Sequence, residues 1–98
     1  MPPLKWSANA QRDLVRLHAF LAEDSPEAAQ RAIAAIRQGV RMLSIHPEIG
    51  RPVDELPIEM REWIVEFGNG AYIIRYRYDR SDVVFLAVRH GREVGYDG

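Results

Sequence analysis

The residues best suited to chemistry lie in the last third of this 98-residue chain, where a predicted strand ends. The segment Arg89-His90-Gly91-Arg92 supplies two guanidinium groups and an imidazole, and Arg75 and Arg77 alternate on the strand before it. Guanidinium groups bind phosphate and carboxylate oxygens, and histidine exchanges a proton near neutral pH. This cluster could therefore bind an anionic partner, or hold a phosphate while His90 transfers a proton.

Alternation along residues 72–78 separates these arginines from the predicted core. Ile73, Arg75 and Arg77 share one face of a strand whose side chains alternate with a period of two. A strip of aromatic residues on the other face could bind nucleic acid, but a core role is the stronger interpretation. The residues of this buried face are Tyr72, Ile74, Tyr76 and Tyr78.

Several candidate side chains also have a structural interpretation. A histidine at the end of a strand more often satisfies backbone carbonyl groups than catalyses a reaction, so a structural role is favoured for His90. Arg75 and Arg77 could form ion pairs with Glu62 and Glu66 on the neighbouring strand. Each pair would add up to about 1 kcal/mol to the folding stability. For Arg77 the structural and partner-binding roles remain equal alternatives.

Residues 47–59 form a long loop that is too interrupted for a regular element. Its length favours a functional loop or a partner surface. Arg51 is expected to shape the loop, and Arg61 is expected to anchor it by hydrogen bonds to its carbonyl groups. The residues that break regular structure here are Pro47, Gly50, Pro52 and Pro57.

The composition, 47% hydrophobic and 28% charged, indicates one globular domain spanning residues 1–98. The absence of cysteine excludes disulfides, thiolate catalysis and cysteine-ligated zinc. No signal-peptide-like start or bilayer-spanning run of roughly 20 apolar residues is present, so we expect a cytoplasmic protein without membrane contact. No cofactor is indicated, and His18, His46 and His90 lack the spacing of a metal site.

The net charge of -1 divides unevenly along the chain. Residues 1 to 70 carry eight Lys and Arg against ten Asp and Glu, whereas residues 71 to 92 carry five against two. A protein that binds phosphate backbones usually has a broader excess of cations, because each neutralised phosphate adds affinity. A general nucleic-acid-binding function is therefore disfavoured.

Two amphipathic helices are predicted in the first half of the chain. Ser7 can cap a helix that ends near Asp24, and Ser25-Pro26-Glu27 combines a serine cap, a first-turn proline and an acid at the positive end of the dipole. His46-Pro47 closes the second helix. The apolar stripes are Ala10, Leu14, Leu17 and Leu21 in the first helix, and Ala29, Ile33, Ile36, Val40 and Leu43 in the second.

Three strands are predicted after the loop, at residues 61–67, 72–78 and 83–89, joined by short turns. Leu4 to Trp6 could add an edge strand. The order of two helices followed by a meander predicts an α+β fold, with an N-terminal helical hairpin packed on an antiparallel sheet of three to four strands.

Four short motifs follow one another along the chain: His46 to Pro52, Met60 to Glu62, Tyr72 to Arg77 and Leu86 to Arg92. Their order and spacing, in a chain of this length, closely resemble the RelE/ParE superfamily of bacterial type II toxins. The resemblance covers nearly the whole chain, although no single motif is diagnostic. It implies a toxin encoded beside an antitoxin that neutralises it, with effects on plasmid maintenance, growth arrest or persistence.

The resembled superfamily contains two activities. RelE-like members cut messenger RNA in the ribosomal decoding site, where the ribose 2'-hydroxyl attacks the neighbouring phosphate. That reaction requires cations that hold the phosphate, a proton acceptor and a proton donor. ParE-like members instead poison DNA gyrase and need no catalytic residue.

The resemblance favours the gyrase-directed activity. ParE-like chains more often end a strand in a segment like Val88 to Arg92, and this chain has a single lysine. Arginine is a poor proton shuttle because its pKa stays above about 12. A RelE-like ribosome-dependent endoribonuclease is the alternative, in which Tyr96 could stack or donate a proton. Its candidate catalytic residues are His90, Arg75, Arg77 and Arg89.

The resemblance also implies a hetero-oligomer with the antitoxin, which lays a helix and an extended strand across the toxin. An exposed sheet edge and a shallow apolar groove beside the helical hairpin would provide the two surfaces. A second alternative is an inactive module that retains only antitoxin binding. The predicted partner-binding residues are Arg51, Arg61, Arg75, Arg77, Arg89, His90 and Arg92.

Overall fold

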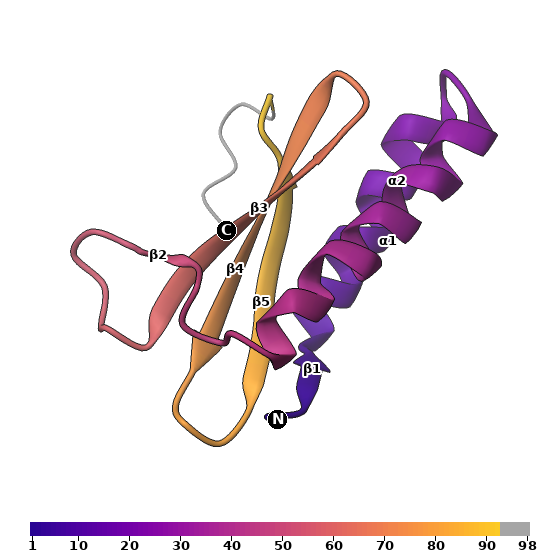
Figure 1. Cartoon of the computed structure of the whole chain (residues 1–98). Coiled ribbons are helices and arrows are strands. Elements are labelled where there is room, and N and C mark those ends of the chain that lie inside the picture. The colour runs from indigo at the N-terminus through magenta and orange to yellow at the C-terminus, as the bar shows by residue number, and fades with distance from the viewer. Residues whose placement is uncertain (93–98) are drawn as a thin grey trace.

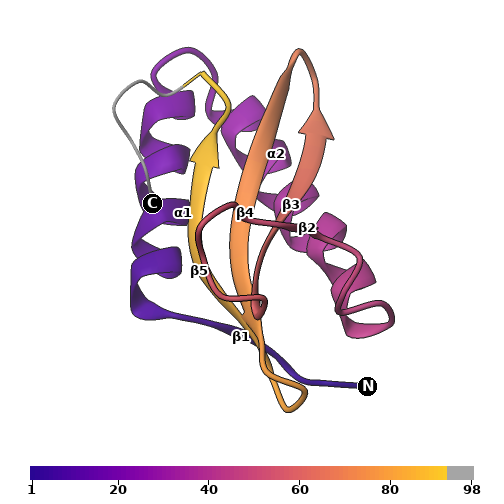
Figure 2. The same ribbon diagram turned by 90° about the vertical axis from the view of Figure 1, so that its left-hand side faces the viewer.

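The computed structural model describes residues 1–92, in which two helices form one layer on one face of a sheet (Figure 1). The view turned by 90° shows the helices behind the strands (Figure 2). The α+β class and the helical hairpin are confirmed. The elements are β1 Leu4–Trp6, α1 Ala8–Ala22, α2 Pro26–Gly39, η1 Val40–Ser44, β2 Arg51–Pro52, β3 Met60–Phe67, β4 Gly70–Tyr78 and β5 Val83–His90.

Both helices begin where the sequence predicted. The Ser7 hydroxyl oxygen accepts a hydrogen bond from the backbone N–H of Ala10 at 3.0 Å, and the Ser25 hydroxyl oxygen accepts one from Ala28 at 3.2 Å. These bonds satisfy backbone donors that lack a partner in the first turn of a helix. The α-helical part of the second helix ends at Gly39, and the 3-10 helix η1 continues the chain toward His46.

The end of α2 depends on a close approach to the sheet. A Cβ atom on Gly39 would lie 2.6 Å from Cγ2 of Val65 on β3, so only glycine fits at this distance. The indole N–H of Trp63 donates a hydrogen bond to the Gly39 carbonyl oxygen at 3.1 Å. Gly39 therefore lets the end of α2 lie directly on β3.

The sheet has five strands in the order β1-β5-β4-β3-β2, more than the three to four expected. It is mixed rather than wholly antiparallel, because β1 pairs parallel with β5 while the other pairs are antiparallel. The strand β2 lies in the loop that was predicted to lack regular structure, where Arg51 pairs with Glu62 and Pro52 with Arg61. A strand of two residues is too short to produce a periodic signal.

The register of β3, β4 and β5 places the aromatic strip of β4 under the helices. A two-residue loop joins Phe67 to Gly70, and its first residue, Gly68, has a φ of 60° that favours glycine. The register of β4 against β5 shifts between Arg75 and Tyr76. Leu86 is therefore an extra residue of β5 and forms a β-bulge. The largest fully buried side chains are Tyr76, Phe85, Leu17, Ile36, Leu43, Ile74, Val83 and Val88.

Within residues 1–92, neither helix combines the length and the apolar character that crossing a membrane requires. In the same range, no group of three or more histidine or acidic side chains is arranged to hold a metal ion.

Candidate functional site

One carboxylate lies at the centre of the arginines on the outer face of the sheet. Glu62 Oε1 is 3.1 Å from a guanidinium nitrogen of Arg51, and Glu62 Oε2 is 3.0 Å from one of Arg75. The Glu62 residue is only 8% exposed. The pairing of β2, β3 and β4 puts these three residues in one row, so a single buried carboxylate pairs with two of the candidate cations and leaves a net charge of about +1 on the cluster.

Arg61 points to the opposite face of β3 and anchors the preceding loop, as the sequence predicted. Its guanidinium group donates hydrogen bonds to the carbonyl oxygens of Glu48 at 3.1 Å and Gly50 at 2.8 Å. The Arg61 side chain is 14% exposed. Its cation is therefore used to hold the backbone of the loop rather than presented to a partner.

Tyr76 holds the same loop in place by two further hydrogen bonds. Its hydroxyl group donates to the carbonyl oxygen of Pro47 at 2.8 Å and accepts from the backbone N–H of Gly50 at 2.9 Å. Burial raises the pKa of Tyr76 above its ordinary value, and the bond from Gly50 opposes that shift in part. A Cβ atom on Gly50 would lie 2.5 Å from the tyrosine oxygen, so Gly50 permits this contact.

His90 is held against the sheet by its neighbours. Its Nδ1 atom accepts a hydrogen bond from the backbone N–H of Arg92 at 3.0 Å, and its ring packs edge-on against Tyr72 with centroids 5.1 Å apart. Burial raises the pKa of Tyr72. The Nε2 atom lies over Gly70, where a Cβ atom would be 2.6 Å away. The lone pair of Nδ1 is therefore engaged by the backbone.

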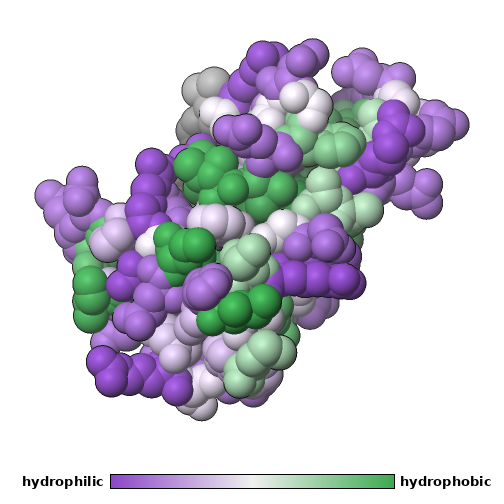
Figure 3. All heavy atoms as spheres, viewed as in Figure 1, coloured by the Kyte–Doolittle hydropathy of each residue, from purple (hydrophilic) through white to green (hydrophobic). Residues whose placement is uncertain are grey.

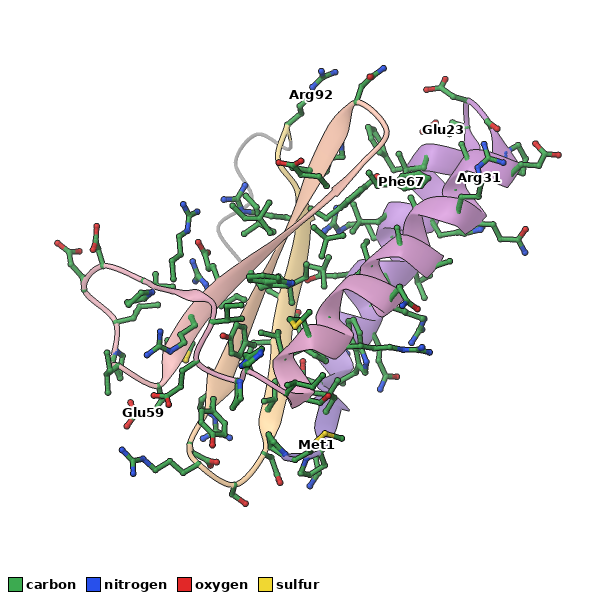
Figure 4. The ribbon with its side chains drawn as sticks, viewed as in Figure 1. Met1, Glu23, Arg31, Glu59, Phe67 and Arg92 are labelled. Carbon is green, nitrogen blue, oxygen red and sulfur yellow. The ribbon has the colours of Figure 1, made fainter. Side chains whose placement is uncertain are left out.

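The remaining candidate cations reach the surface. Arg77 is exposed on β4, Arg89 is half-buried on β5, and Arg92 projects from the end of β5 (Figure 4). Among the described residues, the guanidinium groups of these three arginines form no hydrogen bond or ion pair. Tyr96, which was considered for the ribonuclease alternative, lies outside the described residues.

The structure therefore divides the predicted site residues into two groups. Arg51 and Arg75 meet at Glu62, and Arg77 and Arg89 lie on the same outer face of the sheet. Arg61 lies apart from this group. The arrangement offers guanidinium groups that can bind an anion, and the Nδ1 atom of His90 already accepts a backbone N–H.

The sequence reasoning missed three polar side chains of α1. Asn9, Asp13 and Arg16 bond to the backbone of β5, and Asp13 is only 6% exposed. Polar residues spaced by four and three along a helix form a stripe on one face. That spacing was the signal available in the sequence.

An open groove of ≈ 580 Å³ runs between the outer sides of α1 and α2. Leu14, Val15 and Ile33 supply apolar surface, and the guanidinium carbon of Arg37 lies 5.4 Å from the centroid of the Trp6 ring at one end. The Val15 residue is 71% exposed. This groove matches the predicted apolar surface beside the helical hairpin.

Apolar side chains also reach the surface around η1 and the loop that follows it. Figure 3, which has the same view as Figure 1, shows hydrophobic residues at the surface among hydrophilic ones. The exposed apolar residues of this region are Met42, Ile45, Ile49, Leu56 and Ile58.

The architecture is that of toxins from toxin–antitoxin systems. A solved structure entitled "Chromosomal ParDE TA system from P. aeruginosa" matches with a TM-score of 0.73 and 25% sequence identity, over 90% of this chain and 94% of that chain. This likeness places the fold in the RelE/ParE superfamily, and the resemblance noted in the sequence is confirmed.

The family model described as "ParE toxin of type II toxin-antitoxin system, parDE" matches residues 4–95, and the chain therefore belongs to this family. Two relatives come from Caulobacter vibrioides. "Toxin RelE3" is 34% identical over 93 residues, covering 95% of this chain and 98% of the relative. "Toxin RelE1" is 37% identical over 87 residues, covering 89% and 90% respectively. The chain is thus a toxin of a type II toxin–antitoxin system.

Proposed function

We propose that the chain is a ParE-like toxin that inhibits DNA gyrase and is neutralised when a cognate antitoxin binds it directly. The observation that carries this proposal is the pairing of Glu62 with both Arg51 and Arg75 on the outer face of the sheet. Membership of the ParE toxin family supports gyrase as the target.

Chemistry on RNA would require cations that are available to a phosphate and a base that can accept a proton. Glu62 already occupies the two arginines nearest the centre of the outer face. His90 Nδ1 accepts the N–H of Arg92. Arg77 and Arg89 can bind an anion but cannot accept a proton, because the guanidinium group stays charged. The toxin therefore acts by docking and by stabilising the cleaved-DNA intermediate of gyrase in the cytoplasm.

A RelE-like ribosome-dependent endoribonuclease is the second candidate function. The names of the two Caulobacter vibrioides relatives favour it. The exposed Arg77 and the half-buried Arg89 could also contact ribosomal RNA. An inactive module that only binds antitoxin is the third candidate.

The antitoxin partner is supported by the structural neighbour, whose title names a ParDE toxin–antitoxin system. The groove between α1 and α2 offers apolar surface for a helix, with Arg37 and His18 at its rim. A helix with an apolar face and acidic flanks fits such a groove. We expect a stable hetero-oligomer in which this apolar surface is covered.

The test is induction of the chain with and without its neighbouring gene, followed by parallel assays for gyrase-dependent DNA breaks and for cleavage of ribosome-bound messenger RNA. Breaks with intact messenger RNA are expected, and co-induction of the antitoxin should abolish them. Cut messenger RNA with intact chromosomes would establish the ribonuclease candidate instead. Growth without either effect would establish the inactive module.

A double variant sharpens the assay. Arg77→Ala combined with Arg89→Ala removes one exposed and one half-buried cation from the outer face. Arg31→Ala combined with Arg41→Ala removes two exposed cations from the helical layer as the matched control. If the outer face contacts the target, the outer-face double variant loses toxicity while its affinity for the antitoxin helix is unchanged. Equal toxicity of both variants would exclude the outer face as the target surface.

A further inference from the structure

The turn between η1 and β2 is held in place by side chains from the sheet. Tyr76 on β4, which is fully buried, donates to the carbonyl oxygen of Pro47 and accepts the backbone N–H of Gly50. Arg61 on β3 donates to the carbonyl oxygens of Glu48 and Gly50. These four hydrogen bonds fix the backbone of the turn before any partner binds. Binding at this turn therefore costs little further backbone entropy.

Apolar side chains of the same turn reach solvent although its backbone is fixed. Ile45 is 59% exposed and Ile49 is 46% exposed. Both border an open hollow of ≈ 430 Å³, which Glu48 also lines. Neighbouring apolar side chains at a surface, unlike scattered ones, mark places where a partner binds. The turn therefore combines an ordered backbone with an apolar surface, as a binding site requires.

A second hollow, of ≈ 240 Å³, shares Glu48 with the first. It is lined by Glu59 and by Ile58, which is 67% exposed. Glu59 lies toward the end of the sheet opposite Arg92 (Figure 4). The apolar surface therefore continues from the turn to the loop before β3. We call its residues the acidic apolar patch: Ile45, Glu48, Ile49, Ile58 and Glu59.

The charge around this patch is predominantly negative. Residues 42–59 carry four acids against one cation, which forms an ion pair on the outer face of the sheet. The Glu48 side chain is 68% exposed and lies 3.9 Å from Arg61, whose guanidinium group bonds to backbone carbonyls. Asp79 and Arg80, which line the second hollow as well, carry opposite charges. The patch therefore repels phosphate groups and attracts Lys and Arg side chains.

The outer face of the sheet has the opposite character. Arg77 is exposed and Arg89 is half-buried there, and guanidinium groups bind phosphate oxygens. The cleaved-DNA intermediate of gyrase contains both protein and DNA. A basic surface is complementary to its DNA, whereas an acidic apolar surface is complementary to an apolar protein site with basic flanks. The two surfaces of this chain therefore suit different components of the same target.

We propose that the acidic apolar patch docks the toxin on the protein surface of gyrase, at an apolar site flanked by Lys or Arg, while Arg77 and Arg89 contact the DNA. This inference rests on the proposed function, because gyrase with its bound DNA supplies both contact sites. It assigns the patch to the target rather than to the antitoxin, whose helix fits the groove between α1 and α2.

The first test measures the affinity of the full chain for purified gyrase without DNA, by surface plasmon resonance. Ile49→Ala removes an apolar side chain from the patch. Phe20→Ala removes one of similar exposure, 56% against 46%, from α1 as the matched control. Ile49→Ala should weaken binding roughly 5-fold or more, as truncation of an important interface side chain does, and Phe20→Ala should leave it unchanged. Equal affinity of the two variants, with circular dichroism spectra that show both folded, would overturn the proposal.

A second pair of variants tests the charge of the patch in the same assay. Glu48→Gln combined with Glu59→Gln removes two of its negative charges, and Glu23→Gln combined with Asp24→Asn removes two exposed ones between α1 and α2. The two variants have the same net charge. The patch variant should bind gyrase roughly 3-fold more weakly than the control variant at low salt, and added salt should reduce this difference. Equal binding by the two variants would contradict the charge complementarity.

The remaining outcomes separate this inference from the proposed function. Arg77→Ala combined with Arg89→Ala should keep its affinity for DNA-free gyrase but yield fewer cleaved-DNA complexes. If Ile49→Ala weakens binding to the antitoxin and not to gyrase, the antitoxin occupies the patch and this inference is wrong. If Ile49→Ala instead abolishes self-association in sedimentation without a change in gyrase affinity, a second copy occupies it, and the inference is wrong as well. Failure of the wild-type chain to bind gyrase would contradict the proposed function, and this inference with it.

Discussion

The helix-covered face and the outer face of the sheet are built from the same strands but are stabilised differently. On the covered face, Tyr76 and Phe85 are fully buried among other apolar side chains. On the outer face, Glu62 forms ion pairs with both Arg51 and Arg75. Apolar burial contributes more free energy than ion pairs near a surface. The covered face therefore supplies most of the stability, and the outer face can vary with the partner.

The largest loss of folding stability is expected from a substitution on the helix-covered face of the sheet. Phe85→Ala removes a fully buried ring whose centroid lies 4.4 Å from that of Trp6. The free energy of unfolding should decrease by about 3–5 kcal/mol, because the substitution removes apolar burial and leaves a cavity. Urea denaturation of the variant measures this loss, with Arg31→Ala as a surface control. A change below 1 kcal/mol would show that the covered face does not carry the stability.

A smaller effect is expected where the covered face meets the loop. Tyr76→Phe keeps the ring but leaves the Gly50 N–H and the Pro47 carbonyl without the tyrosine oxygen. Loss of these bonds should lower the free energy of unfolding by about 1–3 kcal/mol. Proteolysis near residues 47–50 should also become faster. Unchanged stability and unchanged cleavage would mean that the loop is held by Arg61 alone.

The outer face should respond in binding more than in stability. Glu62→Gln and Glu66→Gln remove the same charge from β3, but only Glu62 pairs with two arginines among the described residues. Glu62→Gln should cost about 1 kcal/mol of folding stability, because the amide oxygen can still accept a hydrogen bond at this buried position. It should increase retention on a heparin column more than Glu66→Gln does, because two guanidinium groups become available to sulfate. Equal retention would show that Glu62 does not mask these cations.

The smallest effect is a dependence of stability on alkaline pH. Burial raises the pKa of Tyr76 in the folded chain above the ordinary value of 10.0. The unfolded chain therefore loses this proton first as the pH rises, so the contribution of Tyr76 to stability is constant below a pH of about 10 and decreases above it. Tyr76→Phe should show a shallower decrease, with Tyr72 contributing the remainder. Denaturation across this pH range measures the difference, and identical slopes would contradict the burial of Tyr76.

Local signals in the sequence were sufficient to predict the helices and the meander. Ser7 and Ser25 cap the two helices as expected, and the strands after the loop differ from prediction by two residues or fewer at each end. The anchoring of the loop by Arg61 was also predicted correctly, because an arginine beside a loop rich in proline has backbone carbonyls within reach.

Features that join distant parts of the chain were not predicted. The parallel pairing of β1 with β5 joins Leu4 to Val83, and no local pattern specifies such a partner. The hydrogen bond from the Val88 N–H to the Asp13 carboxylate and the ion pairs of Glu62 with Arg51 and Arg75 also join residues that lie far apart in the sequence. Pairing with Glu62 was foreseen as one alternative for Arg75, but the second ion pair, with Arg51, depends on β2, which the sequence did not reveal.

The parallel pairing of Leu4–Trp6 with Val83–Phe85 has a consequence for synthesis of the toxin. A nascent chain cannot complete its sheet until the ribosome has made β5, because β1 has no partner before then. Contacts between residues so far apart in sequence also form slowly. The growing polypeptide therefore remains incompletely folded through most of translation, which gives a newly made antitoxin time to meet the toxin as it folds.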